Sequence, residues 1–134
     1  LARNIQPGAR AQIAADRAAG VLCVLVTAAP EIYAEALGKA LAFDACIATR
    51  HQRDAAGNLL NAIAGENNHG SEKVVRVEAW LAQQGLSRGD CHLTAYTDHA
   101  SDAPILKLAD TGVLVGRYAK PHSGWSQVDW SAPA

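Results

Sequence analysis

The run VLCVLVT, residues 21–27, constrains the fold of this chain more than any other feature. It is six apolar residues closed by a threonine, without the alternation of polar side chains that a half-exposed strand shows. Such a run is typical of a strand buried on both faces, as in a parallel sheet covered by helices. Ala28, Ala29 and Pro30 then open a helix that we expect to continue to about Leu41.

The rest of the chain alternates between helical and extended patterns. We expect a helix at 7–19, a strand at 46–49, a β-hairpin turning at Asp54 and Gly57-Asn58, a helix at 71–84, a strand at 91–97, a short helix capped by Ser101 or Asp102, a strand at 112–116 and an aromatic tail packed on the body. This order predicts a single α/β domain over residues 1–134, a three-layer Rossmann-like parallel sheet with right-handed crossovers and a small hairpin excursion.

The composition indicates which binding partners and which cellular compartment to expect for this chain. Twelve basic residues stand against thirteen acidic ones, so bulk charge favours neither nucleic acid nor an anionic membrane. Cys23, Cys46 and Cys91 lie far apart in apolar runs and form no CxxC, which indicates buried thiols in a reducing compartment. No apolar stretch reaches about 18 residues. We therefore expect a cytoplasmic protein.

Three places put functional groups at the carboxyl ends of predicted strands, where open α/β sheets bind ligands. The Thr27 hydroxyl, with the N–H groups of Ala28 and Ala29 at a helix start, forms a candidate anion site; the alternative is that Thr27 only caps the helix. Lys73 lies in a first helical turn, where the macrodipole opposes a cation unless an anion is bound there. Its alternative is a solvated lysine offset by Glu72.

The third place is the pair Asp98 and Asp102. Two carboxylates at a strand end and a helix start repel one another unless a cation or a proton lies between them. Mg²⁺ prefers oxygen ligands and usually keeps several of its bound waters, so one or two carboxylates suit it. The alternative is that Asp102 is a helix cap and Asp98 a turn residue. Each signal is weak alone, but the order Thr, Lys, Asp-x-x-x-Asp is far less common by accident.

That order, with its surrounding residues, resembles the phosphoserine-phosphatase-like branch of the haloacid dehalogenase superfamily. LVTAAP resembles its second motif, GENNHGSEK the loop and lysine of its third, and AYTDHASDAPIL its acidic fourth motif. The resemblance runs from about Ile5 to Trp130. A receiver domain also uses Asp, Thr and Lys around Mg²⁺, but places the acids first.

The resemblance implies a Mg²⁺-dependent phosphomonoester hydrolase that acts through an aspartyl-phosphate on a small phosphorylated metabolite. Thr27 and Ala28 would bind the phosphoryl oxygens, and Lys73 would neutralise the phosphate and the nucleophile. Asp98 would bind Mg²⁺, with Asp102 either a second ligand or a group that orients the site.

The sequence also departs from this family. Its first motif, D-x-D-x-T on the central strand, and its cap domain are absent, and Asp16, the one carboxylate before Thr27, lies inside a predicted helix. His99 stands where the family has a small residue. Without the central strand, the strands of Thr27 and Asp98 either pair directly, receive a strand from another chain, or pair with a segment preceding Leu1.

Two functions follow from these departures. The chain is either the larger part of a phosphatase core, inactive as it stands because the aspartate nucleophile is missing, or a non-catalytic module that binds phosphate, metal or a partner. In both cases the open strand edges favour pairing with a further segment or between copies of the chain.

Overall fold

The computed structural model describes residues 5–65, 67–99, 102–116 and 125–131. In chain order these form α1 (Pro7–Ala18), β1 (Val24–Pro30), α2 (Glu31–Ala40), β2 (Ala45–Thr49), β3 (His51–Arg53), β4 (Leu59–Ile63), α3 (Ser71–Gln83), a 3₁₀ turn (Arg88–Asp90), β5 (Thr94–Thr97), α4 (Ala103–Leu108), β6 (Thr111–Val115) and β7 (Ser126–Val128). The expected order of elements is confirmed, with one addition: part of the aromatic tail is a strand, β7.

The strands pair as an α/β fold requires. β1 runs parallel to β2, and β5, β6 and β7 form a parallel three-stranded sheet in that order. β3 and β4 form the expected antiparallel hairpin. In its turn Asp54 Oδ1 accepts the N–H groups of Ala56 and Asn58, both at 2.9 Å. The predicted α/β class, parallel pairing and hairpin are therefore correct.

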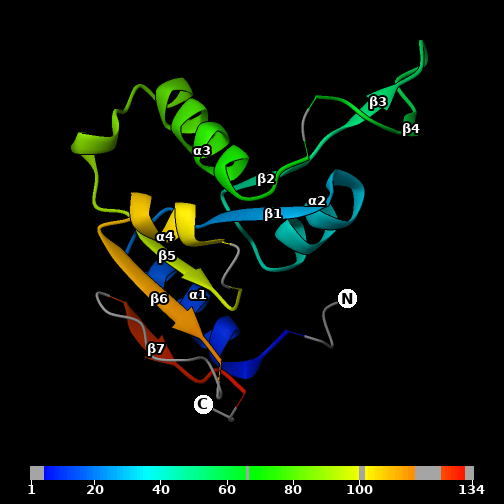
Figure 1. The fold of residues 1–134 in the computed structure, drawn as a ribbon. Helices are drawn as coiled ribbons and strands as arrows, with labels where there is room; N and C mark the ends of the chain where they lie inside the picture. The colour runs from blue at the N-terminus through cyan, green and yellow to red at the C-terminus, as the bar shows by residue number, and fades with distance from the viewer. Residues whose placement is uncertain (1–4, 66, 100–101, 117–124, 132–134) are drawn as a thin grey trace.

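The parallel sheet is divided into two pieces (Figure 1). Among the described residues no ladder of hydrogen bonds joins β1 to β5, so the direct pairing of these two strands is ruled out. The run at 21–27 is also less buried than expected. The strand begins only at Val24, and Val21 and Leu22 remain 51% and 59% exposed. The expectation of burial on both faces was therefore wrong: the residues of β1 are half-buried, and Ala29 is exposed.

Helices α3 and α4 connect the two pieces. Val77 and Leu81 of α3 and Ile105 of α4 form the buried centre of the main core. Half-buried apolar side chains from both pieces pack against that centre, among them Val26, Ile47 and Ala95. The apolar face of α3 was expected from its spacing, and its burial is confirmed. Of the helices in the described ranges, none combines the length and the hydropathy needed to cross a bilayer.

Candidate functional site

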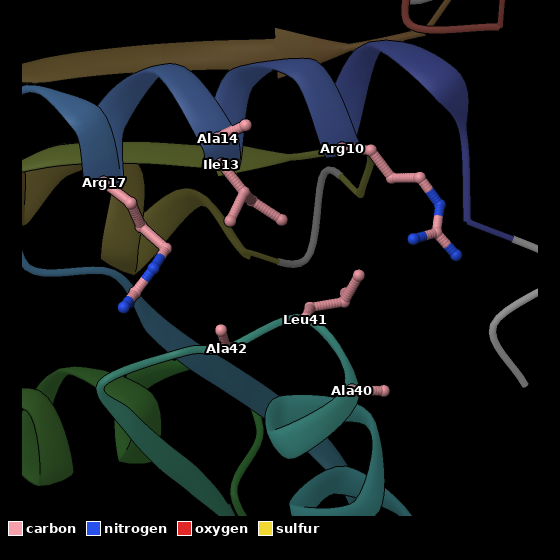
Figure 2. Close-up of a pocket in the computed structure, with 7 residues that line it drawn as sticks. All are labelled: Arg10, Ile13, Ala14, Arg17, Ala40, Leu41 and Ala42. Carbon is pink, nitrogen blue, oxygen red and sulfur yellow. The ribbon is translucent and has the colours of Figure 1, made fainter.

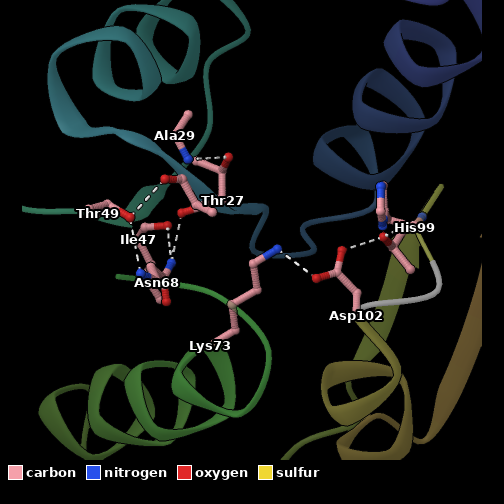
Figure 3. A network of polar contacts seen from close by, with 10 residues as sticks. Thr27, Ala29, Ile47, Thr49, Asn68, Lys73, His99 and Asp102 are labelled. Carbon is pink, nitrogen blue, oxygen red and sulfur yellow. Dashed lines mark hydrogen bonds and ion pairs between the residues drawn. The ribbon is translucent and has the colours of Figure 1, made fainter. Parts of the chain in front are cut away.

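Thr27 lies inside β1 rather than at the start of a helix. The strand continues to Pro30, which occupies the position before α2, and the helix begins at Glu31. The Thr27 hydroxyl accepts the N–H of Ala29 at 3.1 Å (Figure 3). The interpretation of Thr27 as a helix cap is therefore wrong. So is the expected helical setting of Ala28 and Ala29, whose N–H groups belong to the end of a strand.

Lys73 is buried, and its amine is paired with an acid from another element. It is the third residue of α3 and is 8% exposed. Its Nζ lies 2.7 Å from Oδ1 of Asp102 (Figure 3). Glu72 pairs instead with Arg76 one turn along the helix, at 3.4 Å. The alternative of a solvated Lys73 offset by Glu72 is therefore wrong.

Asp102 occupies the cap position of α4, yet its carboxylate makes no cap hydrogen bond. Lys73 binds one carboxylate oxygen, and the Thr97 hydroxyl donates to the other at 2.5 Å. Burial raises the pKa of Asp102, but hydrogen bonds from Lys73 and Thr97 and the charge of Lys73 outweigh it, so the pKa lies below its ordinary value. The cation that this acid needs is therefore supplied by Lys73.

Asp98 differs from Asp102 in being exposed, and no hydrogen bond or ion pair holds it within the described residues. It directly follows β5, at the same strand end as Thr97. Among those residues no group of three or more acidic, histidine or cysteine side chains gathers as a metal site. Mg²⁺ is often bound by one or two carboxylates with several waters. Among the described residues Asp98 is thus the one carboxylate of the predicted pair that stays available for a metal, because Asp102 is paired with Lys73.

Asn68 and Thr49, which the sequence did not single out, tie the loop before α3 to the ends of β1 and β2. Asn68 is 0% exposed, and its amide nitrogen donates to the carbonyl oxygens of Thr27 at 2.8 Å and Ile47 at 3.0 Å. Its backbone N–H donates to the Thr49 hydroxyl at 3.0 Å. Thr49 Oγ1 lies 2.7 Å from the carbonyl oxygen of Ala28. Figure 3 shows these contacts beside Lys73 and Asp102.

For Thr49 the sequence does carry an indication of a role at the site. Thr49 ends the strand ACIAT, just as Thr27 ends its own apolar run, so the same argument from strand ends indicates both. Thr97 also closes a strand directly before Asp98. Asn68 lies in the polar stretch ENNHG, which reads as an ordinary loop, and no pattern in the sequence indicates that it is buried.

Two cavities are lined largely by other residues. One, of about 350 Å³, lies between α1 and the end of α2 and is lined in part by Ile13, Arg17 and Leu41 (Figure 2). The other, of about 620 Å³, is bordered by α2, β2, the hairpin and α3. Neither is lined by Thr27, Lys73, Asp98 or Asp102. The candidate site is therefore described by the strand ends that carry its residues.

Comparison with known proteins gives consistent results. A family model described as haloacid dehalogenase-like hydrolase matches residues 1–107. Protein CicA of Caulobacter vibrioides is 32% identical over 107 residues, covering 79% of this chain and 46% of that protein. Phosphoserine phosphatase SerB1 of Mycobacterium tuberculosis is 28% identical over 135 aligned positions, which cover 97% of this chain and 43% of that protein. The chain thus spans about half the length of the curated relatives it matches.

Solved structures show the same fold. A protein of unknown function from Bordetella pertussis Tohama I superimposes with a TM-score of 0.81 at 28% identity, over 92% of this chain and 57% of that one. A substrate-bound phosphoserine phosphatase superimposes with a TM-score of 0.63 at 22% identity, over 82% of this chain and 51% of that one. At the latter identity the likeness concerns the fold alone.

The buried ion pair gives a stability prediction. Lys73→Met leaves the Asp102 carboxylate buried without its cation and is expected to lower the free energy of unfolding by about 3–5 kcal/mol at pH 7. Lys73→Met combined with Asp102→Asn is expected to recover part of that loss, because the unpaired charge is gone. Urea denaturation measures both.

The control is Arg17→Met, which breaks the exposed pair between Arg17 and Asp44 and is expected to cost about 1 kcal/mol or less. The pKa of Asp102 is lowered on folding, so the pair contributes fully above the unfolded pKa of about 3.9 and progressively less as pH falls through the folded pKa. The advantage of the wild type over Asp102→Asn should therefore shrink in acid. Equal costs for Lys73→Met and Arg17→Met would contradict the assignment.

Proposed function

Because this chain belongs to the haloacid dehalogenase-like hydrolase family, we propose that it forms the phosphate-binding part of a Mg²⁺-dependent phosphomonoester hydrolase of the phosphoserine-phosphatase type. The observation that carries the proposal is Lys73, a buried cation held by Asp102 next to the ends of β1 and β5. Among the described residues Asp102 is the hydrogen-bond partner of its amine, which has three N–H donors. The remaining donors serve phosphoryl oxygens.

The other residues have separate roles in this proposal. The Thr27 hydroxyl and the Ala28 N–H bind phosphoryl oxygens, and Lys73 offsets the negative charge. Asp98 holds Mg²⁺ together with waters, and Asp102 orients Lys73 through a short ion pair. When bound, the metal neutralises charge on the phosphoryl group.

The nucleophile comes from elsewhere in this proposal. The 134 residues contain no D-x-D, so a segment bearing D-x-D-x-T must supply the attacking aspartate and the general acid. In the part of the chain that the structure describes, β1 and β5 each have one side without a strand neighbour, which supports this, since a parallel strand placed between them would complete one sheet. The substrate is a small phosphorylated metabolite, and the setting is cytoplasmic. The alternative is a non-catalytic module that binds phosphate or metal with the same residues.

Oxyanion binding tests the role of Lys73. Tungstate, a phosphoryl mimic, is expected to bind the wild-type chain, and Lys73→Ala is expected to weaken it roughly 10- to 150-fold, because a charge-assisted contact of about 1.5–3 kcal/mol is lost. Isothermal titration calorimetry measures the dissociation constant. Lys107→Ala removes an exposed lysine of α4 and should leave binding unchanged. Equal effects of the two substitutions would refute the proposed site.

Mg²⁺ binding tests the role of Asp98. A titration followed by amide chemical shifts should perturb residues at the end of β5 at millimolar concentrations, since one carboxylate with waters binds weakly. Asp98→Asn should abolish that response, whereas Glu78→Gln, an exposed acid of α3, should preserve it. A response that survives Asp98→Asn would show that the metal binds elsewhere.

Turnover tests whether the nucleophile is missing. The 134-residue chain is expected to hydrolyse p-nitrophenyl phosphate with Mg²⁺ far below the roughly 1–10³ s⁻¹ typical of enzymes, because it lacks an aspartate in line with the phosphorus. Adding a segment that bears D-x-D-x-T is expected to restore hydrolysis. Enzymatic turnover by the chain alone, abolished by Asp98→Ala, would mean that a residue already present is the nucleophile.

A further inference from the structure

Asn68 is the most buried polar residue among those described, and the roles proposed above leave it unused. Both hydrogens of its amide nitrogen are directed at carbonyl oxygens, those of Thr27 and Ile47. This fixes the orientation of the amide, because the opposite rotamer would place its oxygen against two other oxygens. The amide oxygen is buried and has no hydrogen-bond partner among the described residues, so the two carbonyl contacts decide how the side chain is held.

The contact with Thr27 has a consequence for the neighbouring N–H. The peptide unit between Thr27 and Ala28 is planar and trans, so its carbonyl and its N–H point in opposite directions. Holding the Thr27 oxygen therefore fixes where the Ala28 N–H points. The pairing of β1 with β2 is irregular between Val26 and Pro30, which makes this side-chain contact important in setting the strand end.

Thr49 acts in the same way on the next peptide unit. Its hydroxyl lies 2.7 Å from the Ala28 oxygen and 2.8 Å from Oδ1 of Asn67, so its one hydrogen is shared between these two acceptors. Donation to the Ala28 oxygen fixes the direction of the Ala29 N–H. That N–H donates to the Thr27 hydroxyl at 3.1 Å and so orients it. Asn68 and Thr49 are also joined to each other through the Asn68 N–H. The buried residues Asn68 and Thr49 thus contact the carbonyl oxygens of two successive peptide units, those of Thr27 and Ala28.

We propose that Asn68, with Thr49, is a positioning residue of the oxyanion site. Through these contacts it sets the direction of the Ala28 N–H and the Thr27 hydroxyl, and it fixes the start of α3 relative to the end of β1, which sets the position of Lys73. The inference rests on the proposed anion-binding role of Thr27 and Lys73, and neither Asn68 nor Thr49 touches the anion itself.

The test is sulfate binding by the 134-residue chain, since the charge of sulfate is constant between pH 5 and pH 8. Asn68→Asp replaces the donating nitrogen with an oxygen that faces two carbonyl oxygens. At pH 8 we expect binding to weaken about 10-fold or more, because the strand end is pushed out of place. Near pH 5 we expect partial recovery relative to the wild type, because a protonated carboxyl group can donate to one carbonyl.

Two further substitutions separate positioning from stability. Thr49→Val should weaken sulfate binding and Thr49→Ser should retain it, since serine keeps the hydroxyl. If Asn68→Asp does not fold, the comparison of these two Thr49 variants still tests the positioning role. Val77→Ala, at a buried core position one turn beyond Lys73, should lower the melting temperature and leave sulfate affinity within about twofold.

The outcomes distinguish the two proposals. If Lys73→Ala weakens sulfate binding while Asn68→Asp and Thr49→Val bind as the wild type does, the positioning role is wrong and the proposed function stands. If Val77→Ala loses affinity in proportion to its stability, as Asn68→Asp does, Asn68 is only structural. A wild-type chain that binds no sulfate, or that is indifferent to Lys73→Ala, overturns both.

Discussion

The ion pair between Lys73 and Asp102 is the interaction on which the site depends. It joins α3, which packs on the β1 and β2 side, to the start of α4. Because no backbone ladder connects these two pieces among the described residues, side chains hold them together. Because the pair is buried, removing either partner would leave an unpaired buried charge and lower the stability of the fold. The same contact that joins the pieces also directs the Lys73 amine toward the strand ends.

The order of elements could be predicted from the sequence, because each one carries a local signal. The apolar stripe of α3, the Asp54 turn of the hairpin and the unbroken aliphatic run of β1 are all features of short segments. The boundaries were less accurate. Ala28, Ala29 and Pro30 read as a helix start, but the strand continues through them, because Thr49 and Asn68 hold the carbonyl groups on this stretch. Contacts between distant segments overrode the local preference.

The candidate site could be predicted in part for the same reason. Lys73 and Asp102 each carry a separate local signal, a place at a helix start, and nothing local indicates that they are partners. The closeness of Asp98 and Asp102 in the sequence predicts a pair of acids, whereas the structure places Asp102 with a lysine 29 residues away. Asn68 was missed because its burial depends on the ends of two strands, at Thr27 and Ile47, which only the folded chain brings to the loop.

The division of the sheet also affects how the molecule loses its structure. In a continuous sheet, backbone hydrogen bonds spread cooperativity from strand to strand, so opening one edge weakens the next. Within the described residues the ladder of β1 and β2 and that of β5, β6 and β7 share no such bonds, so one ladder can open without breaking backbone hydrogen bonds of the other. All-or-none unfolding then depends on the side-chain contact between the pieces, which is made by the core of Val77, Leu81 and Ile105 and by the ion pair of Lys73 with Asp102. A modest loss of packing at that contact would turn one cooperative unit into two.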